Sequence, residues 1–283
     1  MKINWFKYAS PTAFYPVAGR LVPVLGVAAL GLMLLALYWG FFETPERLGG
    51  TNPQKEYYRI IFIHVPAAWM SMWLYLVLAA WSAVGLVFNT RLSFMMANAV
   101  APTGAIFTFL ALWTGAFWGR PSWGTYWDWD PRLTSELILF FLYIGFMALH
   151  SAIDDSRRAD RAAALLAIVG LVMLPIIYWS INCPDPNNCA ALHQRSSLTD
   201  IESNILTAML VMTLGFWLYS FAAAFARLRN IILLREQDSA WVRKMVDEAG
   251  LPDVSPPNTS TPNAGAADEL DAGGRQANRG MSA

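Results

Sequence analysis

Charged side chains are scarce in this chain. Aspartate, glutamate, lysine and arginine together make up 14% of its 283 residues, whereas 56% are hydrophobic. An ordinary soluble domain carries roughly a quarter charged residues, so this composition, with a mean hydropathy of +0.38, predicts a polytopic membrane protein. The 20 basic and 20 acidic residues cancel, and a formal net charge of zero supports neither nucleic-acid binding nor steering toward an acidic partner.

Histidine and cysteine are rarer still, with three histidines and two cysteines in the whole chain. Cys183 and Cys189 lie in one short stretch, CPDPNNC. We expect a local disulfide if this stretch faces an oxidising compartment, and two thiols if it faces a reducing one. The sequence also lacks a nucleophile, base and acid pattern, a phosphate-binding loop and a dinucleotide fingerprint. We therefore expect no ATPase or hydrolase site in it.

Long apolar segments are the most prominent feature that is present. Each has the roughly 20 residues that a membrane-spanning helix requires. Because backbone groups in lipid must be satisfied internally, and because no segment alternates like a barrel strand, we expect helices. The first segment is too long for a secretory signal and lacks a small-residue cleavage site, so it is predicted to be retained. The predicted fold is an all-α integral membrane protein with six transmembrane helices, at about 21–42, 60–88, 92–118, 133–151, 161–181 and 203–227.

Lysine and arginine set the orientation of these helices, because they concentrate in cytoplasmic loops. With the N-terminus inside, the inner flanks hold Lys2, Lys7, Arg20, Arg91, Arg157, Arg158, Arg161, Arg227, Arg229 and Arg235. The outer loops, at about 43–59, 119–132 and 182–202, then hold Arg47, Lys55, Arg59, Arg120, Arg132 and Arg195. Ten basic residues on the inner side against six on the outer side predict that the N-terminus is cytoplasmic. Because six spans return the chain to the same side, the C-terminus is then cytoplasmic too.

The predicted organisation has four parts. A cytoplasmic N-terminal segment, 1–20, precedes the six-helix membrane domain, 21–229. A charged stretch at 230–250 is compatible with a cytoplasmic amphipathic helix. Residues 251–283 are rich in Pro, Asn, Gly, Ala and Ser, and we expect this tail to be disordered because it cannot bury enough apolar surface to offset the entropy of ordering.

Aromatic residues gather in the second outer loop, where residues 118–132 read WGRPSWGTYWDWDPR. Tryptophan and tyrosine also concentrate at membrane interfaces with no ligand present. Here, however, glycines and prolines interrupt the stretch and argue against one regular helix through it. We favour a loop that presents flat rings to a bound molecule, formed by Trp118, Trp123, Trp127 and Trp129.

Two of the three histidines share this outer face. His64 lies in YYRIIFIHVPAAW, where Pro66 suggests that the helix begins near Val65 or Pro66, and His193 lies in ALHQRSS before the sixth helix. Taken singly, they could be an interfacial histidine and a solvated loop histidine. Together with the tryptophans they suit a planar metallocofactor, above all haem with two axial histidines. A zinc site completed by the two cysteines is a weaker alternative, since C-x5-C is not the usual spacing and zinc gives the tryptophans no role.

Four arginines on the outer face adjoin the histidines and tryptophans, although basic residues usually concentrate in cytoplasmic loops. They could pair with the carboxylates of haem propionates, with nearby aspartates or with lipid phosphate. Asp130 and Glu136 have a structural explanation instead, because acidic residues complement a helix N-terminus. The arginines are Arg59, Arg120, Arg132 and Arg195.

The run WGTYWDWD followed by PRLTSELILFFLYIG closely resembles the tryptophan-rich signature of haem-handling membrane proteins. The runs YRIIFIHVPAAW and LHQ resemble, more narrowly, the haem exporter protein C family, also called the cytochrome c maturation protein C family. The likeness covers about residues 15–235. By this resemblance His64 and His193 would be the axial haem ligands on the periplasmic face, and the loop around Trp123, Trp127, Trp129 and Asp130 would hold the porphyrin.

The resemblance also implies the biological setting. The chain would lie in the bacterial inner membrane, bind b-type haem transiently and present it to a periplasmic haem chaperone during c-type cytochrome maturation. It would work beside subunits of an ATP-binding cassette (ABC) transporter, where ATP hydrolysis would occur, and beside a small single-span subunit.

Three other functions are weaker. A synthetase that attaches haem to apocytochrome would need histidines for a second haem, and only His150 is left over. A b-type electron-transfer cytochrome would need histidine pairs deep in its helices. A solute channel would place polar groups near mid-membrane, where Asn98, Thr108 and Thr114 are few.

Overall fold

The computed structural model describes residues 10–44, 55–180 and 201–248. Every regular element within these ranges is helical, and no strand occurs in them. The elements are α1 (Pro11–Tyr38), η2 (Trp39–Glu43), η3 (Lys55–Ile60), α2 (Ile61–Phe88), α3 (Arg91–Trp123), α4 (Pro131–Ala152), α5 (Ser156–Val169), η4 (Gly170–Val172), α6 (Met173–Trp179), α7 (Ser203–Arg235) and α8 (Ala240–Glu248).

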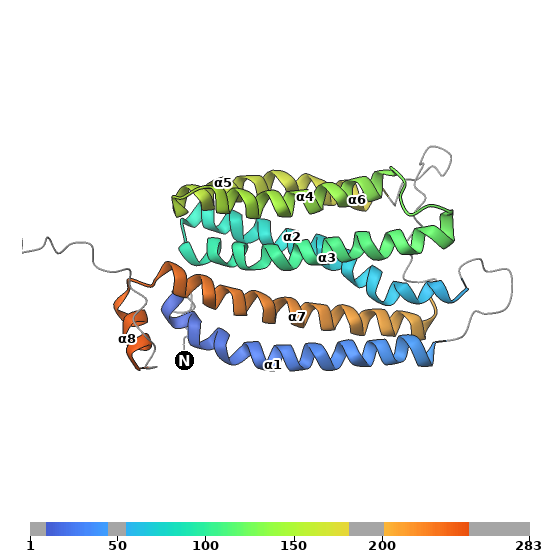
Figure 1. Cartoon of the computed structure of the whole chain (residues 1–283), viewed down its shortest axis with the longest axis horizontal. Coiled ribbons are helices and arrows are strands. Elements are labelled where there is room, and N and C mark those ends of the chain that lie inside the picture. The colour runs from blue at the N-terminus through green and yellow to red at the C-terminus, as the bar shows by residue number, and fades with distance from the viewer. Residues whose placement is uncertain (1–9, 45–54, 181–200, 249–283) are drawn as a thin grey trace, which may run out of the picture. The chain divides into compact units, whose positions relative to one another are not determined.

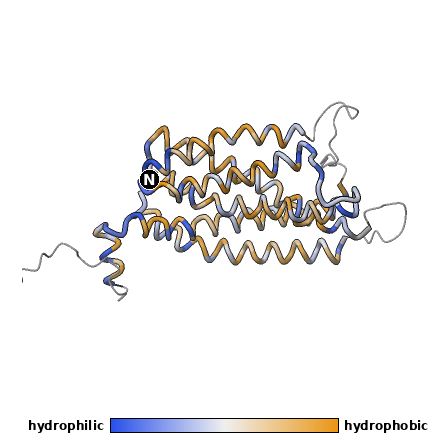
Figure 2. The backbone as a smooth tube through the Cα atoms, turned by 45° about the horizontal axis from the view of Figure 1, so that its top comes forward, coloured by the Kyte–Doolittle hydropathy of each residue, from blue (hydrophilic) through white to orange (hydrophobic). Residues whose placement is uncertain are grey.

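Among the described residues, six helical stretches are long and apolar enough to cross a membrane, which confirms the predicted fold class. The first combines α1 with η2, and the fifth combines α5, η4 and α6. Hydrophobic residues cover the length of the bundle, and hydrophilic residues gather toward its two ends (Figure 2). Large apolar side chains remain exposed along the outside of the helices, as expected of surfaces that face lipid.

Several helix boundaries differ from the predicted ones. The first helix begins at Pro11 because Ser10 caps it, accepting a hydrogen bond from the Ala13 N–H. The third helix continues to Trp123, through Gly119 and Pro121, and ends only where Gly124 adopts a positive φ of 83°. Gly119 has a different role: a Cβ atom there would lie 3.0 Å from the Thr125 carbonyl oxygen, so its absence lets the loop fold back on the helix end. The tryptophan-rich loop is thus shorter than predicted.

The helices of the membrane bundle pack in pairs. α1 lies along α7, α2 along α3, and α4 along α5, and the pair α2 and α3 contacts both of the other pairs. Figure 1 shows the same order, with α2 and α3 in the middle. Central packing depends on small residues: a Cβ atom on Gly104 would overlap the ring of Tyr143, and one on Gly170 would overlap Tyr75. The two tyrosines are fully buried and meet edge to face, with ring centroids 5.0 Å apart.

The fifth span is interrupted near its middle. The three residues of η4 separate α5 from α6, and Pro175 follows within the first turn of α6. Proline has no N–H to bond the carbonyl four residues earlier and its ring crowds that carbonyl. The tighter turn at Gly170–Val172 therefore accommodates the proline without ending the membrane crossing.

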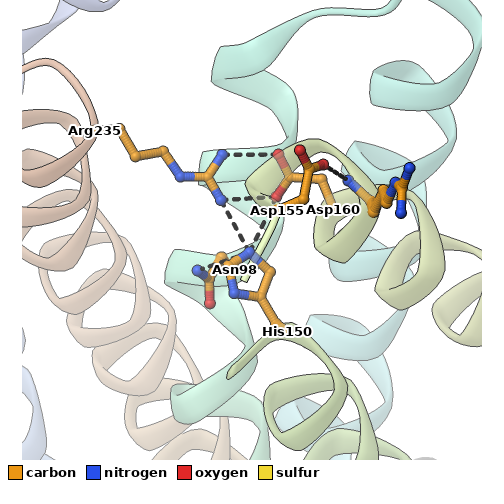
Figure 3. Close-up of polar contacts among 6 residues, drawn as sticks. Asn98, His150, Asp155, Asp160 and Arg235 are labelled. Carbon is orange, nitrogen blue, oxygen red and sulfur yellow. Dashed lines mark hydrogen bonds and ion pairs between the residues drawn. The ribbon is translucent and has the colours of Figure 1, made fainter. Parts of the chain in front are cut away.

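A largely buried ionic cluster joins four helices at the end of the bundle where α7 finishes (Figure 3). Arg235 of α7 donates two hydrogen bonds of 2.7 Å to Asp160 of α5, one to each carboxylate oxygen. His150 at the end of α4 brings Nε2 within 3.0 Å of the same carboxylate and within 2.9 Å of the guanidinium. Asn98 of α3 lies 3.4 Å from that ring nitrogen. The cluster therefore links α7 to α3 of the middle pair and to the pair formed by α4 and α5.

The segment beyond Arg235 forms a second unit, Glu236–Ala283. Within it α8 is a short helix, and the Trp241 indole N–H donates a 2.9 Å hydrogen bond to Glu236. The stretch at 230–250, predicted as one amphipathic segment, is therefore divided between the end of α7 and α8.

We predict that Asp160→Ala destabilises the bundle by about 3 kcal/mol, because removing one partner of a buried ion pair leaves the others uncompensated. Asp160 is only 7% exposed. The measurement is thermal unfolding of the detergent-purified protein, followed by circular dichroism.

Asp155→Ala is the matched control. Asp155 lies nearby but only caps α5, accepting a 2.8 Å hydrogen bond from the Arg158 N–H at an exposed position, and losing a cap costs about 1 kcal/mol. Equal shifts of the melting temperature in the two variants would contradict a special role for the buried cluster.

Candidate functional site

A cavity opens among α2, α3 and α4, at the end of the bundle opposite the ionic cluster. Its walls combine small and apolar side chains with a histidine, three tryptophans, an arginine and a glutamate. The lining residues are His64, Ala68, Met72, Ala111, Leu112, Gly115, Trp118, Ser122, Trp123, Trp127, Arg132, Leu133 and Glu136. Residues from three separate stretches of sequence therefore meet at one site.

His64 is held in the wall of this cavity by α3. Its Nδ1 lies 3.0 Å from the Ala111 carbonyl oxygen and 3.0 Å from Thr114 Oγ1. Its ring meets the Trp118 indole edge to face, with centroids 5.6 Å apart, and the residue is 7% exposed. The side chain is thus fixed on two sides.

The position of His64 in its helix differs from the predicted one. Pro66 suggested a start near Val65 or Pro66, but α2 begins at Ile61, close to the start of the span predicted at about 60–88. Pro66 removes one possible backbone hydrogen bond, to Phe62, and the helix continues through it. His64 therefore projects from the first turn of α2 toward α3, and does not precede the helix.

Three of the four predicted tryptophans line the cavity, namely Trp118, Trp123 and Trp127. The indole nitrogens of Trp118 and Trp127 are buried, and neither has a hydrogen-bond partner among the described residues. Trp129 is 74% exposed, and its ring meets that of Trp127 edge to face, with centroids 5.6 Å apart. It lies beside the cavity, on the outside of the loop.

Of the predicted arginines that the structure describes, one lines the cavity and two do not. Arg132 lines the cavity, and its Nη1 is buried without a hydrogen-bond partner in the part of the chain that the structure describes. Arg59 instead donates to the Gly40 and Phe41 carbonyls, at 2.7 and 2.9 Å, where the first span ends. Arg120 donates to the Gly124 carbonyl at the end of α3. The latter two satisfy helix C-terminal carbonyls, which cations favour.

Asp130 caps α4, as its position before Pro131 suggested. Its Oδ1 accepts a 2.8 Å hydrogen bond from the Leu133 N–H. Its Oδ2 is also buried, and accepts no hydrogen bond within the described ranges. Asp130 orients the helix that bears Arg132, and does not itself line the cavity.

Sequence reasoning missed Glu136 as part of the cavity and assigned it to the helix N-terminus. The side chain is 8% exposed and accepts a 2.5 Å hydrogen bond from Ser71 of α2. Its spacing of four residues from Arg132 places both on one face of α4, and an ionisable residue within an apolar span is a functional signal. Those two signals together could have found it.

Part of the predicted site lies outside the described residues. This part comprises Cys183, Cys189, His193 and Arg195. The assignment of His193 as a second ligand, the disulfide and the zinc alternative all stay predictions.

The arrangement suits a flat, largely apolar ligand that bears both a metal and carboxylates. Indole rings and small side chains form an apolar wall, and a held imidazole can ligate a metal. Indole, hydroxyl and guanidinium groups at Trp118, Ser122 and Arg132 offer donors that the described protein leaves unpaired. Buried donors of this kind are expected to find partners, and a carboxylate would provide them.

Comparison with known proteins gives the same family description from a family model and from individual relatives. A family model described as "Heme exporter protein C" matches residues 4–243. The chain is 40% identical over 244 residues to the heme exporter protein C of Escherichia coli (strain K12), covering 86% of this chain and 96% of the relative. It is 42% identical over 227 residues to that of Bradyrhizobium diazoefficiens, covering 80% and 84%. With the protein of Haemophilus influenzae, the identity is 36% over 243 residues, with 84% and 95% covered.

We predict that Asp130→Ala lowers the stability of the protein by about 1 kcal/mol through loss of the helix cap, and that Asp130→Asn retains most of it, because asparagine is an equally good cap. Thermal unfolding of both variants checks this. If Asp130→Asn were as unstable as Asp130→Ala, the carboxylate charge and not the cap would be the stabilising feature.

Proposed function

Because the chain belongs to the haem exporter protein C family, we propose that it binds haem in the cavity between α2, α3 and α4 and delivers it for c-type cytochrome maturation. The chain is a multi-pass membrane protein with six spans, and its relatives are named as haem exporters. In this proposal haem is a cargo that is bound transiently as b-type haem, and the chain is a delivery subunit without enzymatic activity.

One observation supports the proposal most: His64, three tryptophans and Arg132 come together around one cavity. The tryptophans stack against the ring system, and the unpaired donors of Arg132 and Trp118 bind propionates. His64 is one axial ligand and His193 is the other. Two neutral histidines are a recurrent way of holding haem iron.

The site lies at the end of the bundle that the charge pattern assigns to the periplasm, in the bacterial inner membrane. Trp129 and Tyr126 are exposed beside the cavity, at 74% and 55%. They form a surface on which a periplasmic haem chaperone docks and takes the haem. The subunits of an ABC transporter supply ATP hydrolysis, and a small single-span subunit completes the complex.

The position of His150 weighs against the two alternative haem functions. A haem synthetase or a b-type electron-transfer cytochrome would use it as a ligand of a haem within the membrane. Its Nε2 instead lies 3.0 Å from Asp160 and 2.9 Å from Arg235. Its role at that end of the bundle is structural.

We predict that His64→Gly reduces the haem that co-purifies with the detergent-solubilised protein by at least about tenfold, since an axial ligand is lost, and that added imidazole restores the low-spin absorption spectrum. Absorption spectra of the oxidised and reduced protein, co-expressed with the acceptor chaperone, give the measurement. His150→Gln is the matched control and retains haem. An unaltered spectrum in His64→Gly would remove His64 as a ligand.

We further predict that Arg132→Gln weakens haem binding by about tenfold or more, since a hydrogen bond to a charged group contributes roughly 1.5–3 kcal/mol. Arg120→Gln, a change in an exposed arginine that binds the Gly124 carbonyl, leaves the affinity within about twofold. Haem titration of the two purified variants measures both. Equal losses would indicate a general effect of positive charge near the loop, not a contact of Arg132.

A further inference from the structure

Four residues on one face of α3 contact the His64 side chain. Ala111, Thr114, Gly115 and Trp118 are spaced at three, four and seven residues, which places them in line on a helix. The Ala111 carbonyl and the Thr114 hydroxyl face Nδ1, each at 3.0 Å. Gly115 lies against the ring, since a Cβ atom there would come within 2.9 Å of Cε1. α3 therefore forms a seat for this imidazole.

The chemistry of this seat determines which ring nitrogen bears the proton. A carbonyl oxygen can only accept, so Nδ1 donates to Ala111. The Thr114 hydroxyl has a single proton, which it donates to the Leu110 carbonyl at 2.6 Å, and its lone pairs are thereby left to accept from Nδ1. A neutral imidazole has one N–H, so Nε2 bears the lone pair.

We propose that Thr114 is a positioning residue that, with the Ala111 carbonyl, holds His64 in the tautomer whose Nε2 can ligate haem iron. This inference rests on the proposed function, because it assigns Thr114 a role toward the same cargo. Residues that hold the second nitrogen of a ligating histidine fix its tautomer and its orientation. Thr114 touches the histidine and not the haem.

The chemical type of the groups that accept the hydrogen bond from His64 Nδ1 also affects how readily haem is released. A carboxylate acceptor would raise the basicity of the imidazole and strengthen the ligand. The acceptors here are a hydroxyl and a carbonyl, which are both neutral. Thr114 therefore gives a correctly oriented ligand without the added strength of a charged partner, which suits a cargo that has to leave.

The first test needs no haem. The chain has only three histidines, so ¹⁵N-histidine NMR of the full-length apoprotein in lipid, with single histidine variants for assignment, resolves the tautomer of each. We expect the Nδ1–H tautomer at His64 in the wild type and a mixture of tautomers in Thr114→Val. An Nε2–H tautomer in the wild type, or an unchanged Thr114→Val spectrum, would overturn the role of Thr114.

The second test uses the haem-loaded protein. Thr114→Val is expected to weaken haem binding about tenfold, at the lower end of the range for lost support of a ligand, and to shift the reduction potential and the electron paramagnetic resonance spectrum of the bound haem. Thr114→Ser retains the hydroxyl, and we expect it to restore the haem affinity, the reduction potential and the electron paramagnetic resonance spectrum. Thr108→Val is the control, since Thr108 is buried on the same helix and donates to its own helix at 2.8 Å, to Gly104.

The outcomes separate this inference from the proposed function. If the wild type binds haem through His64 but Thr114→Val and Thr108→Val behave alike, Thr114 has only a packing role and the inference fails. If the wild type binds no haem, the proposed function fails and the assigned role falls with it, whatever the NMR spectra give. Melting temperatures of the apoproteins identify any variant whose losses come from unfolding.

Discussion

Inside a lipid bilayer no water is available to a polar group, so each one has to find a partner in the protein. This constraint makes the spans helical, and it also places the polar side chains where helices meet. Ser71 reaches Glu136 between α2 and α4, His64 reaches Thr114 between α2 and α3, and Asp160 reaches Arg235 between α5 and α7. The few polar groups of an apolar chain thus become its interhelical contacts. The cavity lies between two of these contacts, since His64 and Glu136 both line it, and some of its donors have no partner among the described residues.

The fold could be predicted from the sequence because lipid imposes few choices. Length and apolar composition identify six spans, whereas their ends, their pairing and the interruption of the fifth span needed the structure. The end of α3 was misjudged because glycine and proline at 119 and 121 are typical of a loop, yet a last helical turn tolerates both before Gly124 ends it. The span predicted at about 60–88 fits α2, and only the later start inferred from Pro66 was wrong, because proline is also compatible with a position inside the helix.

The site could be predicted only in part. Aromatic clustering indicated the tryptophans, and the rarity of histidine indicated His64. The roles of Arg59 and Arg120 could not be read from their proximity to the loop, because backbone carbonyls at helix ends compete with any ligand for a guanidinium. Thr114 and Glu136 act through partners 50 and 65 residues away in the chain. No local pattern identifies these partners, although Glu136 itself could have been found from its position four residues after Arg132 in an apolar span.

The packing of α1 has a consequence for biosynthesis. α1 precedes the other described spans in the chain, yet its main neighbour is α7, the sixth span among the described residues. Arg229 of α7 lies 4.5 Å above the Tyr15 ring, and a Cβ atom on Gly19 would come within 3.1 Å of its guanidinium. During translation α1 is therefore inserted well before α7. It lies in the bilayer without this partner until α2 to α6 have also been inserted. Because α1 pairs with α7, the bundle can close only after α7 has been synthesised.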